Sequence, residues 1–398
     1  MNIKQILTIA ITITTLSSCA QKLYFKKEVS HAEAQTDLMI QEIPKADNKN
    51  GTLVTPRTLE GGNLKLVASK DWTSGFFPGE LWYLYELTKN DKWKQEAIKY
   101  SAFIEQEKFN DKTHDMGFKV YCSFGNAYRL TKNENDKNVI ILAAKTLSTR
   151  FSPKVGAIRS WDHNDDKWDY PVIIDNMLNL ELLFEATKLT GDSSFYKIAV
   201  SHANTTMKNH FRSDYSTYHV IDYNPETGLV EHKQTHQGYS DASAWARGQA
   251  WALYGYTMCY RETKDPKYLA QAKNVASFIF NNKNMPADLI PYWDFDVPNI
   301  QNEPRDASAA AVIASALFEL STYTKTNDYL PKASKILKNL STNYNFKNGE
   351  GKGFILNYST GSKPSNSEVN VPLSYADYYY LESLIRANKL KNNKSLFN

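Results

Sequence analysis

One carboxylate stands in an apolar setting that is expected to change its chemistry. Asp175 lies in the run Val172–Leu182, whose apolar residues recur at helical spacing, and Pro171 suits the first turn of such a helix. A carboxylate on the apolar face of a helix is costly unless it is paired or protonated, and such surroundings raise its pKa towards that of a general acid. The pattern favours Asp175 as a proton donor, and it leaves open an Asp that backbone amides or an Arg satisfy.

A second carboxylate, Asp115, lies in the segment Thr113–Phe118, where a loop is expected to meet a helix. By itself this placement predicts a helix N-cap. If the fold brings Asp115 to the same pocket as Asp175, the two groups titrate as a pair and one of them can keep a proton.

The densest set of polar and aromatic side chains lies in the segment 235–251. Arg247 and Trp251 are four residues apart on an expected helix and share a face. Arg offers a planar fork that matches a carboxylate, and Trp offers a flat stacking surface. Gln237 and His219 lie in the preceding loop, where they can reach sugar hydroxyls or a carboxylate. Core packing remains the alternative for the tryptophan.

Two further tryptophans, Trp72 and Trp161, fall in expected loops. Several tryptophans at one mouth suggest a sugar cleft, because flat rings cover the apolar faces of sugars, whereas anchoring of the loops is the alternative. The histidines are scattered without metal-ligand spacing, and the sequence has no Gly-rich phosphate loop, HExxH pair or nucleophile elbow. The sequence therefore implies neither a metal nor a cofactor.

A recurrent corner indicates how these residues are positioned. Five times an apolar helical stretch ends in Thr, a few turn residues and the cap of another helix. The corners begin at Thr88, Thr131, Thr190, Thr263 and Thr326. With further helices expected at 31–43 and 374–390, they predict an all-α (α/α)6 barrel of six helical hairpins. The long connections then share one end, where a site is expected, and segment 215–235 alternates like a small β-hairpin inserted in one of them.

Length, composition and charge indicate which classes of protein the chain can belong to. The chain has 398 residues, 42% hydrophobic and 13% aromatic, which suits one large globular domain. The formal charge is +4, and without residues 1–18, which contain Lys4, it is +3. This charge is too small to predict a nucleic-acid partner or attraction to an anionic membrane surface.

The N-terminus resembles an export signal. Lys4 precedes the apolar run 6–16, which is too short to span a membrane, and Leu16–Cys19 resembles the bacterial lipobox. We therefore expect a lipoprotein signal peptide over 1–18, a tether over 19–30 after a lipidated Cys19, and a single catalytic domain over 31–398. No acidic run follows Cys19, which favours a lipid anchor on the periplasmic side of a bacterial membrane. The cell surface, or a plain secretory signal, is the alternative.

Taken together, these motifs resemble the unsaturated glucuronyl hydrolases, glycoside hydrolase family 88. The resemblance covers nearly all of the mature chain and is strongest at 71–82, 114–118, 171–183 and 234–251. It implies an (α/α)6 barrel in which Asp115 and Asp175 are the catalytic aspartates. The substrate-binding residues that it implies are His219, Gln237, Arg247 and Trp251, with Trp72 and Trp161 at aromatic subsites.

In some members of that family, a loop with two serines and a lysine contacts a sulfate on the neighbouring sugar. Ser359, Ser362 and Lys363 resemble this loop, although here the lysine directly follows the second serine. The resemblance therefore extends to a sulfate-contacting loop with altered spacing.

The resemblance also implies an unusual reaction on oligosaccharides that end in the unsaturated uronic acid left by a polysaccharide lyase. The family hydrates the C4=C5 double bond and does not attack the anomeric carbon. Asp175 would protonate C4 and then accept a proton from the water that adds at C5. The resulting hemiketal opens and releases the neighbouring sugar, while Asp115 would hold substrate hydroxyls and keep Asp175 protonated.

Three other functions stay open. The unsaturated rhamnogalacturonyl hydrolases share the barrel and similar chemistry, although the long motif ending at Trp251 favours the glucuronyl enzymes. A polysaccharide lyase using His219 and a Tyr would create the absorbing double bond rather than destroy it. A non-catalytic glycan-binding lipoprotein would leave the bond unchanged, and an acid on an apolar helix face argues against it.

Overall fold

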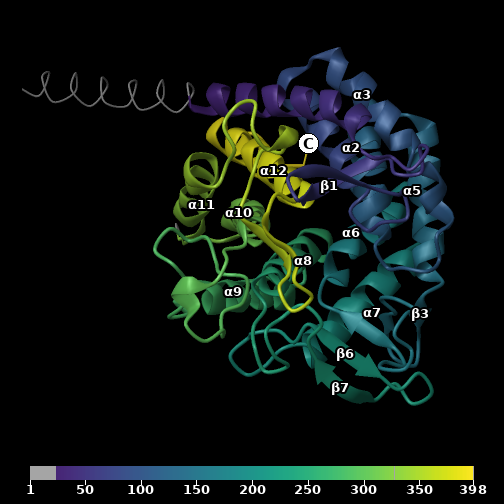
Figure 1. Ribbon diagram of the computed structural model, residues 1–398. Helices are drawn as coiled ribbons and strands as arrows, with labels where there is room; N and C mark the ends of the chain where they lie inside the picture. Colours follow the sequence, from purple (N-terminus) through teal and green to yellow (C-terminus); the bar gives the residue numbers. More distant parts are fainter. Residues whose placement is uncertain (1–23, 327, 398) are drawn as a thin grey trace, which may run out of the picture.

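The computed structural model describes residues 24–326 and 328–397, and these form twelve helices in two concentric rings around a common axis (Figure 1). Neighbours in the inner ring contact one another all the way round, and α12 closes the ring against α2. The inner ring consists of α2 (Phe76–Thr88), the π-helical η3 (Gly117–Gly125) continued by α4 (Asn126–Thr131), α6 (Asn176–Thr190), α8 (Ala246–Thr263), α10 (Ala307–Leu320) and α12 (Ser374–Lys391). The outer ring consists of the helix over 24–42, α3 (Asp91–Ala102), α5 (Glu134–Ser148), α7 (Ser193–Asn209), α9 (Pro266–Asn281) and α11 (Tyr329–Asn343). The predicted (α/α)6 barrel is confirmed.

Burial distinguishes the two rings. The sequence of α10 is almost entirely small or apolar, and every one of its residues is buried between α8, α11 and α12. In α11, by contrast, only one stripe is buried, with Ala333, Ile336, Leu337 and Leu340 on it. A helix that is apolar all round belongs inside a core and one with a single apolar stripe belongs on its surface, so composition assigns α10 to the inner ring and α11 to the outer ring.

The corners between inner and outer helices repeat one hydrogen-bond pattern. At the first, the Thr88 hydroxyl donates to the Leu84 carbonyl (2.7 Å), Lys89 takes a left-handed φ of +59°, and the Asn90 side chain accepts from the Lys92 N–H (3.1 Å). The corners at Thr131, Thr190 and Thr263 do the same. The fifth predicted corner, at Thr326, is looser, because α10 already ends at Leu320 and Asp328 makes no capping bond.

The long connections carry small sheets at the opposite end of the barrel. The predicted hairpin at 215–235 is confirmed as two strands, but a third strand joins it, and three further two-stranded sheets were not expected. The strands are β1 (Thr55–Glu60), β2 (Asn63–Val67), β3 (Phe151–Ser152), β4 (Ala157–Ile158), β5 (Pro171–Ile173), β6 (Val220–Tyr223), β7 (Val230–Gln234), β8 (Ser359–Ser362) and β9 (Ser367–Val371). Short 3-10 turns lie at Ile43–Lys45, Glu105–Phe109, Ile300–Asn302, Ser321–Tyr323 and Gly351–Gly353.

One of these strands corrects the prediction for Asp175. Pro171 begins β5 rather than a helix, and α6 starts only at Asn176. The segment 171–173 pairs with β6, and all three of its residues are buried, so it shows no alternation; such a short apolar run cannot be distinguished from a helix by its periodicity. Asp175 therefore lies at the beginning of the helix, not on its apolar face.

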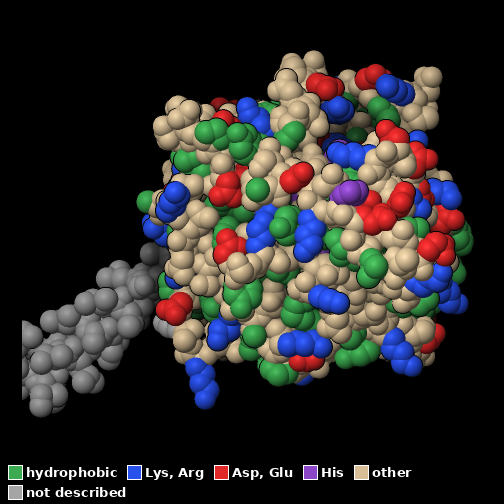
Figure 2. Space-filling view, turned by 90° about the horizontal axis from the view of Figure 1, so that it is seen from below, with side chains coloured by type: hydrophobic (Ala, Val, Ile, Leu, Met, Phe, Trp, Pro, Cys, Tyr) green, Lys and Arg blue, Asp and Glu red, His purple; other side chains and the backbone are tan. Residues whose placement is uncertain are grey.

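The N-terminal part also differs from expectation. Residues from 24 onwards are helical, and Glu28 is buried and accepts a hydrogen bond from Tyr380 on α12 (3.0 Å). The tether predicted over 19–30 is therefore wrong for residues 24–30, while the predicted signal peptide and Cys19 lie outside the described residues. In the described part of the chain, no helix has the length and apolar character needed to cross a membrane. On the face in Figure 2, acidic and basic side chains are interspersed, in keeping with the small net charge.

Candidate active site

The predicted site residues gather where the inner helices begin. Each inner helix runs from the long connections towards the short corners, so its N-terminus faces the end of the barrel that carries the sheets. Helix N-termini carry partial positive charge, and several converging on one region favour an anionic ligand there.

A strand pairing places Asp175 beside His219. Because β5 runs antiparallel to β6, Ile174 just after β5 lies opposite the start of β6, and its N–H donates to the His219 carbonyl (3.1 Å). The Asp175 Oδ2 atom lies 3.6 Å from His219 Nε2, and the Asp175 residue is 7% exposed. Although Asp175 occupies the N-cap position of α6, its side chain makes no capping bond and is left for other contacts.

A close approach of two inner helices brings Asp115 to the same place. A Cβ atom on Gly117 would lie 2.6 Å from the Asn179 Cα, so only glycine allows η3 to pack this tightly against α6. The Phe118 N–H donates to Asn179 Oδ1 (3.0 Å) and fixes this contact. Asp115 and Asp175 each lie just ahead of one of these helices, and they are close enough for the negative charge of Asp115 to act on the carboxyl group of Asp175.

The surroundings of Asp115 stabilise its anion. The Thr113 hydroxyl donates to Asp115 Oδ2 (2.6 Å), and His114 Nε2 lies 3.0 Å from Oδ1. Burial would raise the pKa of Asp115, but His114 and Thr113 hold it below its ordinary value. The simpler prediction, that the Asp115 side chain caps a helix N-terminus, is wrong, because this side chain contacts Thr113 and His114 instead.

Asp175 has the opposite electrostatic character. The pKa of Asp175 is raised to about 6, chiefly by burial and also by the negative charge of Asp115, while neighbouring His114 and Arg247 oppose the rise. Two neighbouring carboxyl groups whose environments push their pKa values apart form an acid and a permanent anion. The geometry thus gives Asp175 a proton to donate near neutral pH.

His219 is a neutral hydrogen-bond donor. Its Nδ1 accepts from the backbone N–H groups of His236 and Gln237 (both 3.1 Å), so its proton is on Nε2, the atom that faces Asp175. Burial lowers the pKa of His219 well below its ordinary value. The ring lies against Trp245, with centroids 4.6 Å apart.

Aromatic side chains surround this pair of acids in a rim that we define as Trp72, Tyr375, Trp245, His236 and Trp161. Trp72 packs on Tyr375 (4.9 Å between centroids), and the Arg247 guanidinium lies over both Tyr375 (5.4 Å) and Trp245 (4.4 Å). On the other side, Trp161 packs against His236 (5.8 Å). Within the aromatic rim, Trp72 is half-buried and His236 is exposed, so these two rings offer accessible surface for a sugar, whereas Tyr375, Trp245 and Trp161 are buried.

Buried polar atoms without a partner are concentrated in this region. Seven of the nineteen such atoms among the described residues belong to this region: Trp161 Nε1, Asp175 Oδ2, His219 Nε2, Arg247 Nε, Trp251 Nε1, Ser359 Oγ and Tyr375 Oη. Buried polar groups in folded proteins are almost always hydrogen-bonded, so such a cluster indicates a place for a polar ligand. Among the described residues, no group of three or more His, Cys, Asp or Glu side chains is arranged to hold a metal ion.

Comparison with known proteins identifies the family of the chain. Residues 46–391 match the model of Glycosyl Hydrolase Family 88.

The chain belongs to this family. It is 55% identical over 326 residues to an unsaturated glucuronyl hydrolase of Formosa agariphila, covering 81% of this chain and 82% of that one. It is 33% identical over 343 residues to an unsaturated chondroitin disaccharide hydrolase of Streptococcus pneumoniae, covering 84% and 86% of the two chains. Among solved structures, an unsaturated glucuronyl hydrolase specific for heparin superposes with a TM-score of 0.88 and 47% identity, covering 94% of this chain and 99% of that one.

In this family member the Arg247 guanidinium is not a free fork for a substrate carboxylate, as was predicted, because protein groups already bind it. Its Nη1 donates to Asp306 Oδ2 (2.9 Å) and to the Thr360 carbonyl (2.5 Å), and its Nη2 donates to the Gly361 carbonyl (2.6 Å). The fork is therefore engaged with Asp306 and β8, and Nε is the one guanidinium nitrogen that has no protein partner. Sequence spacing gave no signal for these partners, because they lie far along the chain.

Trp251 also differs from expectation. It is 0% exposed and packs on Phe118 (5.3 Å between centroids), so its ring offers no open stacking face. Trp245, two residues ahead of Arg247, borders the site instead, because its ring lies against His219 and under the Arg247 guanidinium. Because α8 starts only at Ala246, Trp245 lies in the loop that precedes this helix.

The β8–β9 hairpin forms one wall of the site. Ser359 is fully buried in β8, whereas Ser362 and Lys363 lie half-buried towards the turn, where the Ser362 hydroxyl contacts Ser365 Oγ (3.1 Å). Gln237 Nε2 donates to the Gly361 carbonyl (3.0 Å), which joins this wall to the loop that holds His219.

The structure adds residues that were not singled out as functional. His114 directly precedes Asp115, and that adjacency was a signal that could have identified it. Asp306 and Tyr375 gave no such signal, because both contact Arg247, from which they are distant in sequence.

Proposed function

We propose that this family 88 enzyme removes the 4,5-unsaturated glucuronic acid from the non-reducing end of lyase-generated oligosaccharides by hydrating the C4=C5 bond. The observation that carries the proposal is the buried Asp175 carboxyl, with its pKa raised to about 6, beside the ionised Asp115. Relatives that act as unsaturated glucuronyl or chondroitin disaccharide hydrolases support the substrate class.

In the proposed reaction, Asp175 donates its proton to C4, and the positive charge that develops at C5 is shared with the ring oxygen. Water then adds at C5 and gives a proton to the Asp175 carboxylate, which restores the acid. The product is a hemiketal, and its opening releases the neighbouring sugar. Asp115 stays anionic beside the developing positive charge, and an anion placed there before the reaction stabilises it.

The uronate carboxylate and the sugar hydroxyls would meet donors that have no protein partner. His219 Nε2, Arg247 Nε and Tyr375 Oη are buried and unpaired, and they lie around the two acids. The N-termini of the inner helices add positive potential at the same end. The substrate thus supplies the missing hydrogen bonds, and its sugar rings are proposed to lie against the aromatic rim.

The absorbance of the conjugated double bond tests this function directly. Purified protein should remove the absorbance of unsaturated disaccharides made by lyases from chondroitin, heparin or ulvan, faster than that of a pectin-type unsaturated disaccharide. A rise in absorbance with intact polysaccharide would indicate a lyase, and binding without any absorbance change would indicate a glycan-binding protein. Either result would overturn the proposal.

We also propose that the chain is exported as a lipoprotein and held through Cys19 on the periplasmic side of a bacterial membrane. The motif Leu16–Cys19 after the apolar run supports this location. Replacing Cys19 with Ser should move the protein from the membrane fraction to the soluble fraction of the native host. An unchanged membrane fraction would contradict the anchor.

A further inference from the structure

A β-bulge directs one arginine towards the site from the first long connection. In the β1–β2 hairpin, Pro56 pairs with Leu66 and Thr58 pairs with Lys65, which leaves Arg57 as the extra residue between them. A bulge of this kind turns a side chain away from the direction that the regular ladder would give it.

The Arg57 guanidinium joins two segments that are far apart in sequence. Its Nε and Nη2 atoms donate to the two carboxylate oxygens of Glu368 on β9 (2.5 and 3.0 Å), and its Nη1 donates to Asp71 Oδ2 (2.7 Å). We refer to Arg57, Glu368 and Asp71 as the Arg57 clamp. The side chains of Arg57 and Asp71 are 21% exposed and that of Glu368 is 9% exposed, so solvent screens this ion pair only partly.

Each carboxylate of the clamp fixes a wall of the site. Asp71 Oδ1 accepts hydrogen bonds from the Thr73 N–H (2.9 Å) and hydroxyl (2.6 Å), which orders the turn that carries Trp72 of the aromatic rim. Glu368 lies directly over β8, because a Cβ atom on Gly361 would be 2.5 Å from Glu368 Oε2. One guanidinium therefore connects the Trp72 turn to the β8–β9 hairpin.

The hairpin has a backbone that needs such support. Glu368 has a φ of +56°, and Asn366 and Asn370 also have positive φ values of 48° and 60°. A non-glycine residue in the left-handed region is unfavourable by itself and persists where surrounding contacts hold it. The fork of Arg57 on Glu368 is such a contact.

The carbonyls of this hairpin are the partners of two site residues. Thr360 and Gly361 accept from the Arg247 guanidinium, and Gly361 also accepts from Gln237. Gln237 in turn donates its backbone N–H to His219 Nδ1, which fixes the proton of that ring on the atom facing Asp175. A shift of β8 would displace Arg247 and Gln237 together.

We propose that Arg57 is a positioning residue for the family's reaction, acting through Glu368 and β8 on Arg247 and Gln237 and through Asp71 on the Trp72 turn. It does not touch the substrate. The inference rests on the function proposed above, since it assigns Arg57 a part in binding the unsaturated uronate.

Replacement of Arg57 by Lys and of Glu368 by Gln tests the clamp. Lys keeps the charge but has no planar fork to bridge two carboxylates, so both variants should raise KM for the unsaturated disaccharide at least fivefold while kcat changes less than threefold. Because the charge of Arg247 lowers the pKa of Asp175, a displaced Arg247 should also move the alkaline limb of kcat/KM to higher pH. The Arg57→Lys/Glu368→Gln double variant should be no worse than either single variant, since both remove the same contact.

The control is Lys65→Ala, which breaks an exposed ion pair with Glu60 in the same hairpin and should leave KM and the pH profile unchanged. The inference is overturned if the clamp variants keep the wild-type KM and alkaline limb, or if their activity falls by one factor at every pH as the folded fraction falls. Thermal unfolding measured for each variant separates these cases, and Glu368→Gln carries the same prediction if Arg57→Lys does not fold. A wild-type protein that is inactive on every unsaturated disaccharide would refute the proposed function instead of the clamp.

Discussion

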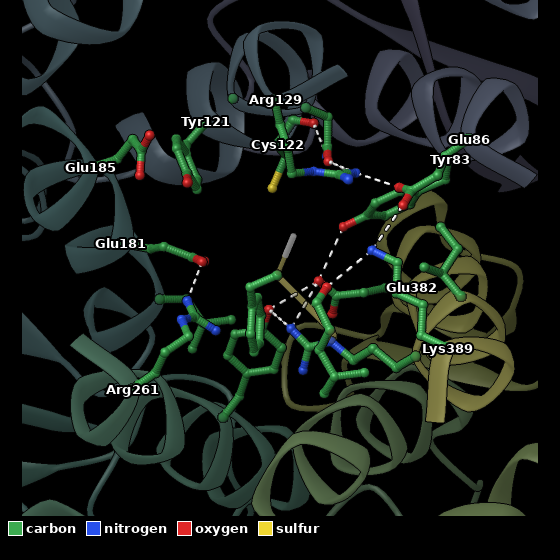
Figure 3. A pocket seen from close by; sticks show the side chains of 18 of the residues that line it. Tyr83, Glu86, Tyr121, Cys122, Arg129, Glu181, Glu185, Arg261, Glu382 and Lys389 are labelled. Carbon is green, nitrogen blue, oxygen red and sulfur yellow. Dashed lines mark hydrogen bonds and ion pairs between the residues drawn. The ribbon is translucent and has the colours of Figure 1, made fainter. Parts of the chain in front are cut away.

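The two ends of the inner ring contain different kinds of buried polar group. At the end with the long connections, Asp175, His219, Arg247 and Tyr375 each keep a buried polar atom without a partner. At the end with the short corners lies a cavity of about 740 Å³, into which charged and tyrosine side chains point (Figure 3). Among the described residues that line this cavity, none has a fully buried polar atom without a partner.

The charged groups of the corner-end cavity are paired with one another. Arg261 contacts the carboxylates of Glu181, Glu262 and Glu319. Arg386 contacts Glu319 and Glu382, and the Tyr254 hydroxyl donates to Glu382 (3.0 Å). This network ties α6, α8, α10 and α12 together across the ring. The comparison teaches that buried polar atoms without a partner indicate the site in this protein. The large cavity at the other end is lined by charged groups that are paired with one another, and these pairs hold the inner helices together.

The largest expected difference between the ends comes from their carboxyl groups. Asp175→Asn should lower kcat by about 100- to 10,000-fold because it removes the proton donor, whereas Glu181→Gln should leave kcat within threefold. Absorbance assays on an unsaturated disaccharide measure both. If Asp175→Asn were as active as the wild type, Asp175 would not be the proton donor.

The same Asp175→Asn variant should be more stable than the wild type at pH 8. The pKa of Asp175 is raised in the folded protein, so ionised Asp175 opposes folding as pH rises from about 4 to about 6. At about 1.4 kcal/mol per pKa unit, the gain is at most about 3 kcal/mol at pH 8 and should vanish below pH 4. Urea unfolding at both pH values measures it, and a gain of equal size at pH 4 would contradict this origin.

A matched pair of arginines gives the next effect. Arg247→Lys should raise KM by about 10- to 100-fold through loss of Nε and of the fork that fixes it to β8. Arg261→Lys at the corner end should keep KM and instead lower the free energy of unfolding by about 1 to 3 kcal/mol, because it leaves buried carboxylates under-paired. If Arg261→Lys raised KM as much as Arg247→Lys, the corner end would also take part in substrate binding, which would contradict its structural role.

The pH dependence of turnover should follow the acid of the site. Since Asp175 must be protonated to react, kcat/KM should fall roughly tenfold per pH unit above a pKa of about 6. Glu181 at the corner end also has a raised pKa, to about 7, chiefly through burial, but its replacement by Gln should leave the profile in place. A profile that rises with pH through this range would show that Asp175 reacts as an anion.

The smallest effect is expected from two buried tyrosines. The Tyr375 hydroxyl has no partner, so Tyr375→Phe should leave stability unchanged and raise KM about fivefold, equivalent to one hydrogen bond of about 1 kcal/mol. Tyr254→Phe should leave KM unchanged and lower stability by about 1 kcal/mol, because its hydroxyl is bonded to Glu382. Reversed outcomes in thermal unfolding and kinetics would show that the substrate does not bond to Tyr375.

The helices and corners were predictable because their signals are local. The Thr–turn–Asn/Asp corner at Thr88 satisfies its own hydrogen bonds within a few residues, and its repetition gave five of the six hairpins. The motifs of the family gave Asp115 and Asp175, and the structure brings them together. The short strands escaped prediction because β3 and β4 have two residues each and show no alternation.

The amino-acid sequence by itself thus determined the helical hairpins, the family and the positions of its two aspartates. Only the tertiary structure decided how burial and neighbouring charges separate the pKa values of the two aspartates, where Arg247 places its fork and which tryptophan borders the site. The physical reason is that burial and partner choice arise between segments far apart in sequence, such as Gly117 with Asn179 and Arg247 with Thr360. Local periodicity carries no information about such contacts, whereas the closed ring of helices fixes them.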